Sequence, residues 1–177
     1  MLQMIGRSPR PKADLVGVLL ECHGRIRHFS ALAIALGERT DLGHGEIAEA
    51  CVQVERYFEH AMPLHVSDEE DSVLPRLAGR SPSIDAALAR MRDQHDLHES
   101  VIERVCAATR ARRADPENDH ARAALLAIAR PLEFVLEAHL RAEEETIFPA
   151  IRAELTSDEQ DQILRELRLR RLLDEVA

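Results

Sequence analysis

Apolar residues recur every three or four positions along most of this chain, which is the spacing of one face of an α-helix. In the first such segment the pattern is carried by Ile26, Phe29, Ala33, Ile34 and Gly37. Almost no stretch alternates Val, Ile and Thr with polar residues, as a half-buried strand would. The pattern therefore predicts four long helices and a short fifth one, over residues 13–37, 45–78, 82–113, 115–155 and 156–177.

Prolines and capping residues mark where these helices should begin and bend. Ser81 followed by Pro82 is typical of a helix start, because a serine side chain accepts from free backbone N–H groups and proline suits the first turn. Residues 115–117, Asp-Pro-Glu, repeat this signal. Pro63 and Pro131 each remove a backbone donor inside a predicted helix, so a bend is expected at both.

Short turns between long helices imply that neighbours in sequence run antiparallel. The predicted fold is all-α: an up-and-down antiparallel four-helix bundle over residues 13–155, preceded by a loose arm at 1–12 that is rich in Arg, Pro and Lys. Residues 156–159 cap a short C-terminal helix within 156–177. This fifth helix either packs across one end of the bundle or mediates homo-oligomerisation, and the sequence leaves both possibilities open.

Composition and charge agree with one helical domain that binds neither nucleic acid nor a membrane surface. The 177 residues are 45% hydrophobic and 31% charged, and only 3% are aromatic. Ala, Leu, Arg and Glu, which favour helices, dominate. The formal net charge is −9, with acids and bases interspersed. The chain thus lacks the basic stripe of a nucleic-acid-binding protein and the basic helix of a membrane-surface protein.

Neither a signal peptide nor a transmembrane span is expected, because the apolar run from Leu15 to Leu20 is short and follows Asp14. We therefore expect a cytoplasmic protein. The three cysteines, Cys22, Cys51 and Cys106, show no C-x-x-C spacing. Disulfides and a thiolate zinc site are both disfavoured by this count and spacing.

The strongest feature is a motif that occurs once in each half of the chain. The copies read HVSDEEDSVLP from His65 and HLRAEEETIFP from His139. The histidine, two adjacent glutamates, an apolar residue and the proline recur at identical spacing. A further histidine lies on the helix before each copy, His23 in the first half and His95 in the second. Each half is thus a helix with one histidine, followed by a helix with H-x-x-x-E.

This spacing has a chemical consequence. Residues four apart on an α-helix lie on the same face, roughly 5–6 Å apart. A histidine can therefore bind one metal ion while the glutamate one turn later bridges to a second. Four imidazoles and two carboxylates suit iron, manganese or zinc, and iron is the predicted metal. The predicted ligands are His23, His65, Glu69, His95, His139 and Glu143.

A simpler interpretation is open. A single H-x-x-x-E on a helix is usually an exposed ion pair, and duplication of a purely structural hairpin would repeat it. Burial decides between the two, and apolar neighbours such as Val66, Val73, Leu136 and Leu140 indicate that both motifs face the core. Burying an unpaired ion costs several kcal/mol, against a total stability of about 5–15 kcal/mol. Such a core requires metal ions or tight ion pairing, and a metal-free helical interaction protein is the alternative.

The order of these residues resembles the hemerythrin-like (HHE cation-binding) domain family, over roughly residues 14–155. The resemblance implies an up-and-down four-helix bundle with a non-haem centre of two iron ions joined by an oxo or hydroxo bridge. Such a centre meets dioxygen or its reduction products. In that arrangement one iron is held by His23 and His65, the other by His95 and His139, and the bridging residues are Glu69 and Glu143.

The chain departs from the oxygen-carrying hemerythrins at two positions. Those proteins have a histidine one turn after the third-helix ligand, where this chain has Glu99. Their last motif is H-x-x-x-x-D, whereas Glu143 falls one residue earlier. Anionic oxygen ligands favour the ferric state, which weakens the case for reversible oxygen carriage. Glu99 is either a seventh ligand, four residues after His95, or an exposed charge.

Three further residues lie next to the predicted ligands. His98, three residues after His95, could reach the site or lie behind the ligands, but we expect it to be partly exposed. Glu70 and Glu144 each follow a predicted bridging glutamate and point about 100° away from it. They are expected either at the surface or behind the ligands, where a carboxylate can orient an imidazole.

Two classes of function follow. The first is a di-iron protein that binds or reacts with dioxygen, peroxide or nitric oxide; if it is an enzyme, peroxide disproportionation is the expected reaction. The second is an iron- or oxygen-responsive regulatory module without catalysis. A ferritin-like carboxylate oxidase is rejected, because its paired E-x-x-H motif occurs here only once, from Glu117 to His120.

Overall fold

A computed structural model describes residues 14–174 of the chain. The predicted N-terminal arm, residues 1–12, lies outside the described residues, as do Ala13 and residues 175–177. Every regular element in residues 14–174 is helical. No helix in this part of the chain combines the length and the apolar character that crossing a membrane requires.

Four long helical rods form the bundle, and a fifth helix follows. The first rod is α1 (Leu15–Glu38) and the third is α5 (Pro82–Ala114). The second rod consists of α2 (His44–Arg56), a π-helical turn (Tyr57–Ala61), α3 (Met62–Ser67), a second π turn (Asp68–Val73) and α4 (Leu74–Leu77). The fourth consists of α6 (Asp119–Ala142), a third π turn (Glu143–Ile147) and α7 (Phe148–Glu154), and the chain ends in α8 (Ser157–Asp174).

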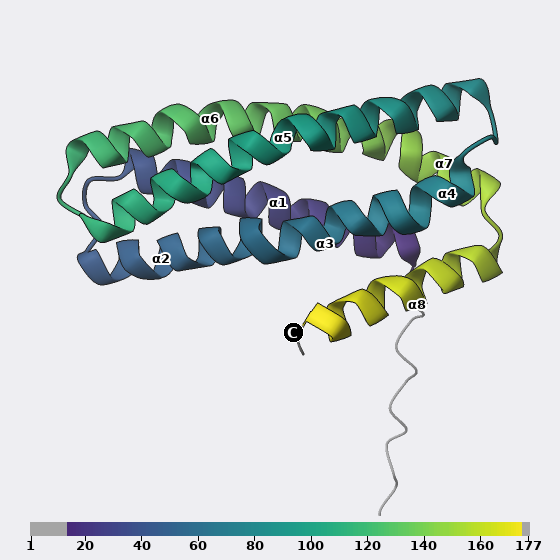
Figure 1. Cartoon of the computed structure of the whole chain (residues 1–177), viewed down its shortest axis with the longest axis horizontal. Helices are drawn as coiled ribbons and strands as arrows, with labels where there is room; N and C mark the ends of the chain where they lie inside the picture. The colour runs from purple at the N-terminus through teal and green to yellow at the C-terminus, as the bar shows by residue number, and fades with distance from the viewer. Residues whose placement is uncertain (1–13, 175–177) are drawn as a thin grey trace, which may run out of the picture.

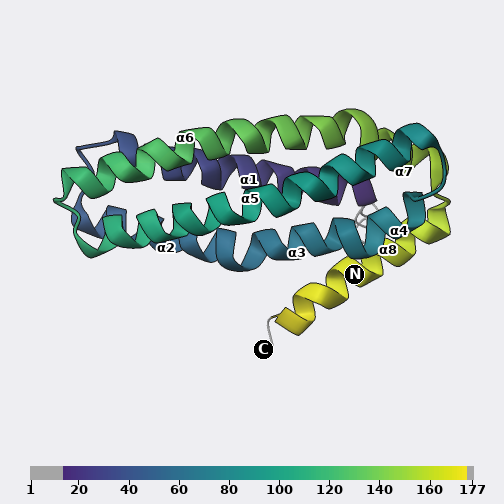
Figure 2. The same ribbon diagram turned by 45° about the horizontal axis from the view of Figure 1, so that its top comes forward.

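The rods lie side by side along the long axis of the molecule, and short turns at the two ends connect them (Figure 1). Contacts are most extensive between α1 and α6 and between α5 and α6, with α2 packed on α1 and α5. The α8 helix folds back across one end and diverges from the bundle toward its own C-terminus (Figure 2). The predicted all-α up-and-down bundle with a short C-terminal helix is confirmed.

Side-chain caps explain where the helices begin. The Ser81 hydroxyl accepts from the backbone N–H of Ile84 at 3.2 Å, as predicted for the start of α5. The α6 helix begins at Asp119 rather than at the predicted 115–117, because the Asn118 side chain accepts from the N–H groups of the first turn. At the start of α8, Thr156 and Glu159 cap one another reciprocally.

A proline is the second residue after each of the three π turns. Pro63, Pro75 and Pro149 lie in the first two positions of the α-helical segments that succeed the turns. A π turn contains one extra residue and so interrupts the regular i to i−4 hydrogen bonds, which is where a residue without an N–H causes the least loss. Pro131, in contrast, lies inside an uninterrupted stretch of α6, so the helix continues through this predicted bend.

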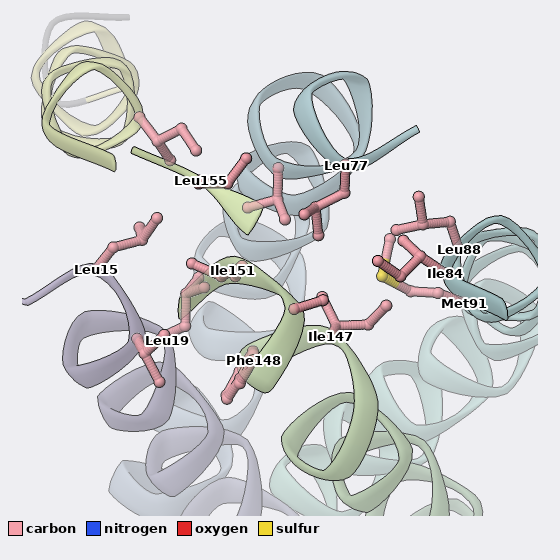
Figure 3. Packing of buried hydrophobic residues seen from close by; sticks show 14 of the residues in the cluster. Leu15, Leu19, Leu77, Ile84, Leu88, Met91, Ile147, Phe148, Ile151 and Leu155 are labelled. Carbon is pink, nitrogen blue, oxygen red and sulfur yellow. The ribbon is translucent and has the colours of Figure 1, made fainter. Parts of the chain in front are cut away.

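Two clusters of buried apolar side chains fill the bundle. One lies at the α8 end, where Leu15 and Leu19 of α1 meet Ile147 and Ile151 of the fourth rod (Figure 3). Three α8 residues complete this cluster: Ile163, Leu164 and Leu167. The other cluster fills the opposite end, between α1, α2, α5 and α6. On the first three rods, a predicted metal-binding histidine (His23, His65 or His95) lies in the sequence interval between the two clusters, and on the fourth rod His139 lies next to Leu140, the last residue of the second cluster.

Gly37 allows α1 and α6 to approach closely. A Cβ atom at Gly37 would lie 2.7 Å from Leu126 Cβ and 2.8 Å from its Cα and N. Because backbone atoms cannot move aside locally, we expect Gly37→Ala to lower the free energy of unfolding by about 1–3 kcal/mol. Gly24→Ala is the matched control on the same helix, since no other described residue lies within 4 Å of its added Cβ. It should raise stability by about 0.5–1 kcal/mol. Equal urea midpoints for the two variants would contradict this packing.

Candidate metal centre

The structure brings the six predicted ligands together in the middle of the bundle. They come from all four rods, and each is buried: the largest exposed fraction, at His95, is 8%. Two sets of donor atoms within 4.8 Å of one another can each surround a metal ion. The first set is His23, His65, Glu69 and Glu143, and the second is Glu69, His95, His139 and Glu143.

Both glutamates belong to both sets, and each directs one oxygen to either side. Glu69 Oε1 lies 3.4 Å from His65 Nε2, while its Oε2 lies 3.4 Å from His95 Nε2. Glu143 mirrors this, with Oε1 3.1 Å from His139 Nε2 and Oε2 3.2 Å from His23 Nε2. The two halves of the chain are thus related by an approximate twofold arrangement at the centre. Such carboxylates are placed to bridge two cations.

Each of these glutamates lies in a π turn. Glu69 is the second residue of the turn Asp68–Val73, and Glu143 is the first residue of Glu143–Ile147. Single π turns within α-helices occur frequently at functional sites. The H-x-x-x-E spacing predicts that histidine and glutamate share a face, but the expected rods were regular α-helices. The π turns are therefore a correction to the prediction.

Polar groups outside the cluster orient three of the four imidazoles. His23 Nδ1 donates to Glu144 at 2.8 Å, and His95 Nδ1 donates to Glu70, also at 2.8 Å. His139 Nδ1 lies 2.9 Å from the side-chain oxygen of Gln94. These bonds fix the rings so that Nε2 faces the centre. Histidines that bind metals commonly have such a partner on the second ring nitrogen.

The inward atoms fit a metal ion better than they fit one another. Among the described residues, no hydrogen bond satisfies His23 Nε2, His65 Nε2, Glu69 Oε2 or either oxygen of Glu143. His95 Nε2 and His139 Nε2 face each other at 3.2 Å. With Nδ1 as the donor on both rings, two lone pairs meet there, so only a proton or a cation makes this approach favourable. Buried polar atoms are nearly always satisfied in folded proteins.

The comparison with known families agrees with this geometry. The sequence model of the hemerythrin HHE cation-binding domain matches residues 14–151. The chain belongs to this family. No curated protein sequence matches the chain.

In this hemerythrin-family domain, burial and neighbouring charges give the histidines of the centre different pKa values. The two glutamates differ in the same way. Burial opposes a charge on His23, but the carboxylates of Glu143 and Glu69 outweigh it and raise its pKa to about 10. Burial is the main cause that lowers the pKa of His139 to about 3. Burial and the charge of Glu69 raise the pKa of Glu143 to about 7. The pKa of Glu69 is lowered, because nearby imidazoles, led by His65, outweigh its burial. Metal binding to such a cluster must displace protons.

Glu99 and His98 of α5 differ in their relation to the centre. Glu99 is exposed and belongs to neither set of candidate ligands. His98, expected to be partly exposed, is buried with 7% of its surface accessible, which corrects the prediction. Its ring packs edge-on against His139, with centroids 5.2 Å apart. The reason is its position three residues after His95, which turns it toward the same side of α5.

Sequence reasoning missed the link between the centre and α8. Asp68, one residue before Glu69, is fully buried and forms ion pairs with Arg170 and Arg171 of α8. Arg170 also donates to the Ser72 hydroxyl. The only signal in the sequence was an acid within the motif and a basic pair near the C-terminus, and such pairs are common on exposed surfaces.

Proposed function

We propose that this chain is a non-haem di-iron protein that binds or reacts with dioxygen, peroxide or nitric oxide. One observation carries the proposal: two buried sets of donors share two carboxylates, and several of their inward atoms have no hydrogen-bond partner within residues 14–174. In this proposal His23 and His65 hold one iron, and His95 and His139 hold the other. Glu69 and Glu143 bridge, and Glu99 is not a ligand.

Iron is favoured by the donor set. Imidazole and carboxylate suit iron, manganese and zinc, and no cysteine belongs to either set of candidate ligands among the described residues. Two imidazoles and two carboxylate oxygens per ion leave coordination positions open for a small ligand. A pair of irons supplies redox chemistry, which zinc cannot.

The surrounding residues hold the donors of the centre in position. Phe148 lies over His23, with ring centroids 4.9 Å apart, and closes the centre toward the α8 end. Glu70, Gln94 and Glu144 hold the imidazole rings from behind. If the protein is an enzyme, disproportionation of hydrogen peroxide is the reaction we propose, because two adjacent redox-active metals can exchange two electrons with it.

A second candidate function is regulatory, and the Asp68 link favours it. The ion pairs of Asp68 connect the π turn that carries Glu69 to α8. Three α8 leucines, Leu169, Leu172 and Leu173, are 56–63% exposed. Occupancy of the centre could therefore alter a surface through which α8 binds a second copy of the chain. No catalysis is needed for this function.

One experiment separates the two functions. Iron-loaded protein is given hydrogen peroxide while oxygen release is recorded, and its association state is measured by light scattering with and without iron. Oxygen release well above that of the same amount of free iron supports the enzyme. Iron-dependent association without oxygen release supports the regulatory module. Neither turnover nor association, together with an optical spectrum that peroxide and nitric oxide leave unchanged, would contradict both functions.

Cytoplasmic location is part of the proposal. Its support is that Cys22, Cys51 and Cys106 are all buried and free of disulfides, as is usual in a reducing compartment.

A further inference from the structure

A groove of about 780 Å³ runs between the second rod and α5, and it ends at the candidate metal centre. Its floor is apolar and includes Phe58, Met62 and Ile102. At its inner end lie His95 and the carboxylate partner of that histidine, Glu70. The groove therefore connects the surface with the half of the centre that contains His95 and His139.

Acidic side chains dominate the wall of this groove. Asp96, Glu99 and Glu103 follow one another at the i, i+3 and i+7 positions of α5, which places them in a row along one face. All three are exposed, and no hydrogen bond or ion pair within residues 14–174 engages them. Among residues 14–174, the one arginine in the lining is Arg110, and it is paired with Glu59. The row thus keeps its negative charge.

A buried histidine lies between this row and the centre. His98 lines the groove, although 93% of its surface is inaccessible to solvent. Its Nδ1 atom has no hydrogen-bond partner among the described residues, and its ring contacts His139. An imidazole nitrogen without a hydrogen-bond partner at this point can coordinate a cation that enters the groove.

The other half of the centre faces a groove of opposite charge. That groove, of about 610 Å³, is lined by His65 and by three arginines, Arg25, Arg56 and Arg171, of which Arg171 is paired with Asp68. Among the described residues, Asp174 is the only acid in its lining. Cations would be repelled there and attracted to the acidic groove. The charge of the wall therefore distinguishes the two approaches to one centre.

We propose that the acidic groove is the route by which divalent iron reaches the buried centre. Asp96, Glu99 and Glu103 concentrate the hydrated cation at the groove, and His98 binds it transiently before His95 and His139 do. The inference rests on the proposed metal centre but assigns residues outside the ligand set. A groove lined by one sign of charge can raise the rate of association with an oppositely charged ion by 10–10³-fold.

The test is the rate at which metal-free protein takes up ferrous iron without oxygen. Samples are quenched at intervals with a chelator that removes only unbound iron. The triple variant Asp96→Asn, Glu99→Gln, Glu103→Gln is expected to load about tenfold more slowly at low ionic strength. Its final iron content should equal that of the wild type, and raising the salt concentration should shrink the difference, because salt screens exposed charges.

A matched triple variant controls for net charge. Glu21→Gln, Glu133→Gln and Glu154→Gln remove three exposed acids that do not line this groove. This control should load at the wild-type rate. Equal slowing of both triple variants, or no slowing of the groove variant, would overturn the route. A wild-type protein that takes up no iron would instead refute the metal centre itself.

His98→Gln tests the relay step separately. We expect slower loading with an unchanged final content of two irons. A content of one iron would show that His98 is a permanent ligand, and an unchanged rate would show that it takes no part in uptake. Either result would overturn the role assigned to His98.

Discussion

Ferrous iron is expected to raise the melting temperature of the metal-free protein by roughly 10–20 °C. Only the folded chain brings all six donors together, so iron binds the native state and not the unfolded one. At a free concentration of about 100 times the dissociation constant, each site contributes about 2.7 kcal/mol. In a domain of this size each kcal/mol shifts the melting temperature by about 2–4 °C. Differential scanning calorimetry with and without iron measures the shift.

Ligand variants should remove most of this gain. His65→Ala and Glu143→Ala each delete a donor that is about 98% buried at the centre. His28→Ala, on the exposed side of α1, is the control and should keep the full shift. If both ligand variants retain the wild-type iron content, the assignment of ligands is wrong.

Glu70→Ala and Glu144→Ala are each expected to weaken iron binding by about 10–100-fold without changing the stoichiometry of two irons. These carboxylates accept from the Nδ1 atoms of His95 and His23 and so fix the rings. Without them, the rings lose their orientation and the imidazoles become weaker donors. Competition with a chelator of known affinity measures the dissociation constants.

The neighbouring acid Glu145 supplies the control for this second prediction. It is exposed, whereas Glu144 beside it is partly buried and bonded to His23. Glu145→Ala should leave the affinity unchanged. If it lowers the affinity as much as Glu144→Ala does, the negative charge near the centre governs binding and the orientation of the ring does not. That result would contradict the role assigned to Glu144.

Helical periodicity and capping were sufficient to predict the bundle. The spacing of apolar residues predicts the rods, and Ser81 with Pro82 locates the start of α5 correctly. The Asp115-Pro116 signal places the start of α6 a few residues too early. The side chain of Asn118 accepts from two backbone N–H groups and so caps the helix in place of Asp115. Local sequence thus identifies the element, whereas its boundary depends on which of several capping residues is used.

The clustering of candidate ligands was predicted because the same motif occurs twice. One H-x-x-x-E would not have distinguished a metal site from an exposed pair, but His65 and His139 with matching glutamates imply two faces that meet. The π turns at Glu69 and Glu143 could not be predicted in this way. An extra residue in a turn costs local hydrogen bonding and is stabilised by tertiary contacts that no local pattern records.

Contacts between segments far apart in the chain could not be predicted from the sequence either. The burial of His98 depends on how closely α5 approaches α6, and the pairing of Asp68 with α8 depends on the direction in which α8 folds back. Charged residues on helices are usually solvated, so neither contact has a distinctive local signature. The connection between the centre and the C-terminal helix is therefore a finding of the structure alone.

The central claim is that two metal ions lie between the four rods and share Glu69 and Glu143. Anomalous diffraction on either side of the iron absorption edge, from crystals of iron-loaded protein, tests it most directly. We predict two iron peaks, one beside His23 and His65 and the other beside His95 and His139. A single peak, peaks outside the bundle, or a centre whose donors contact only one another would contradict the account.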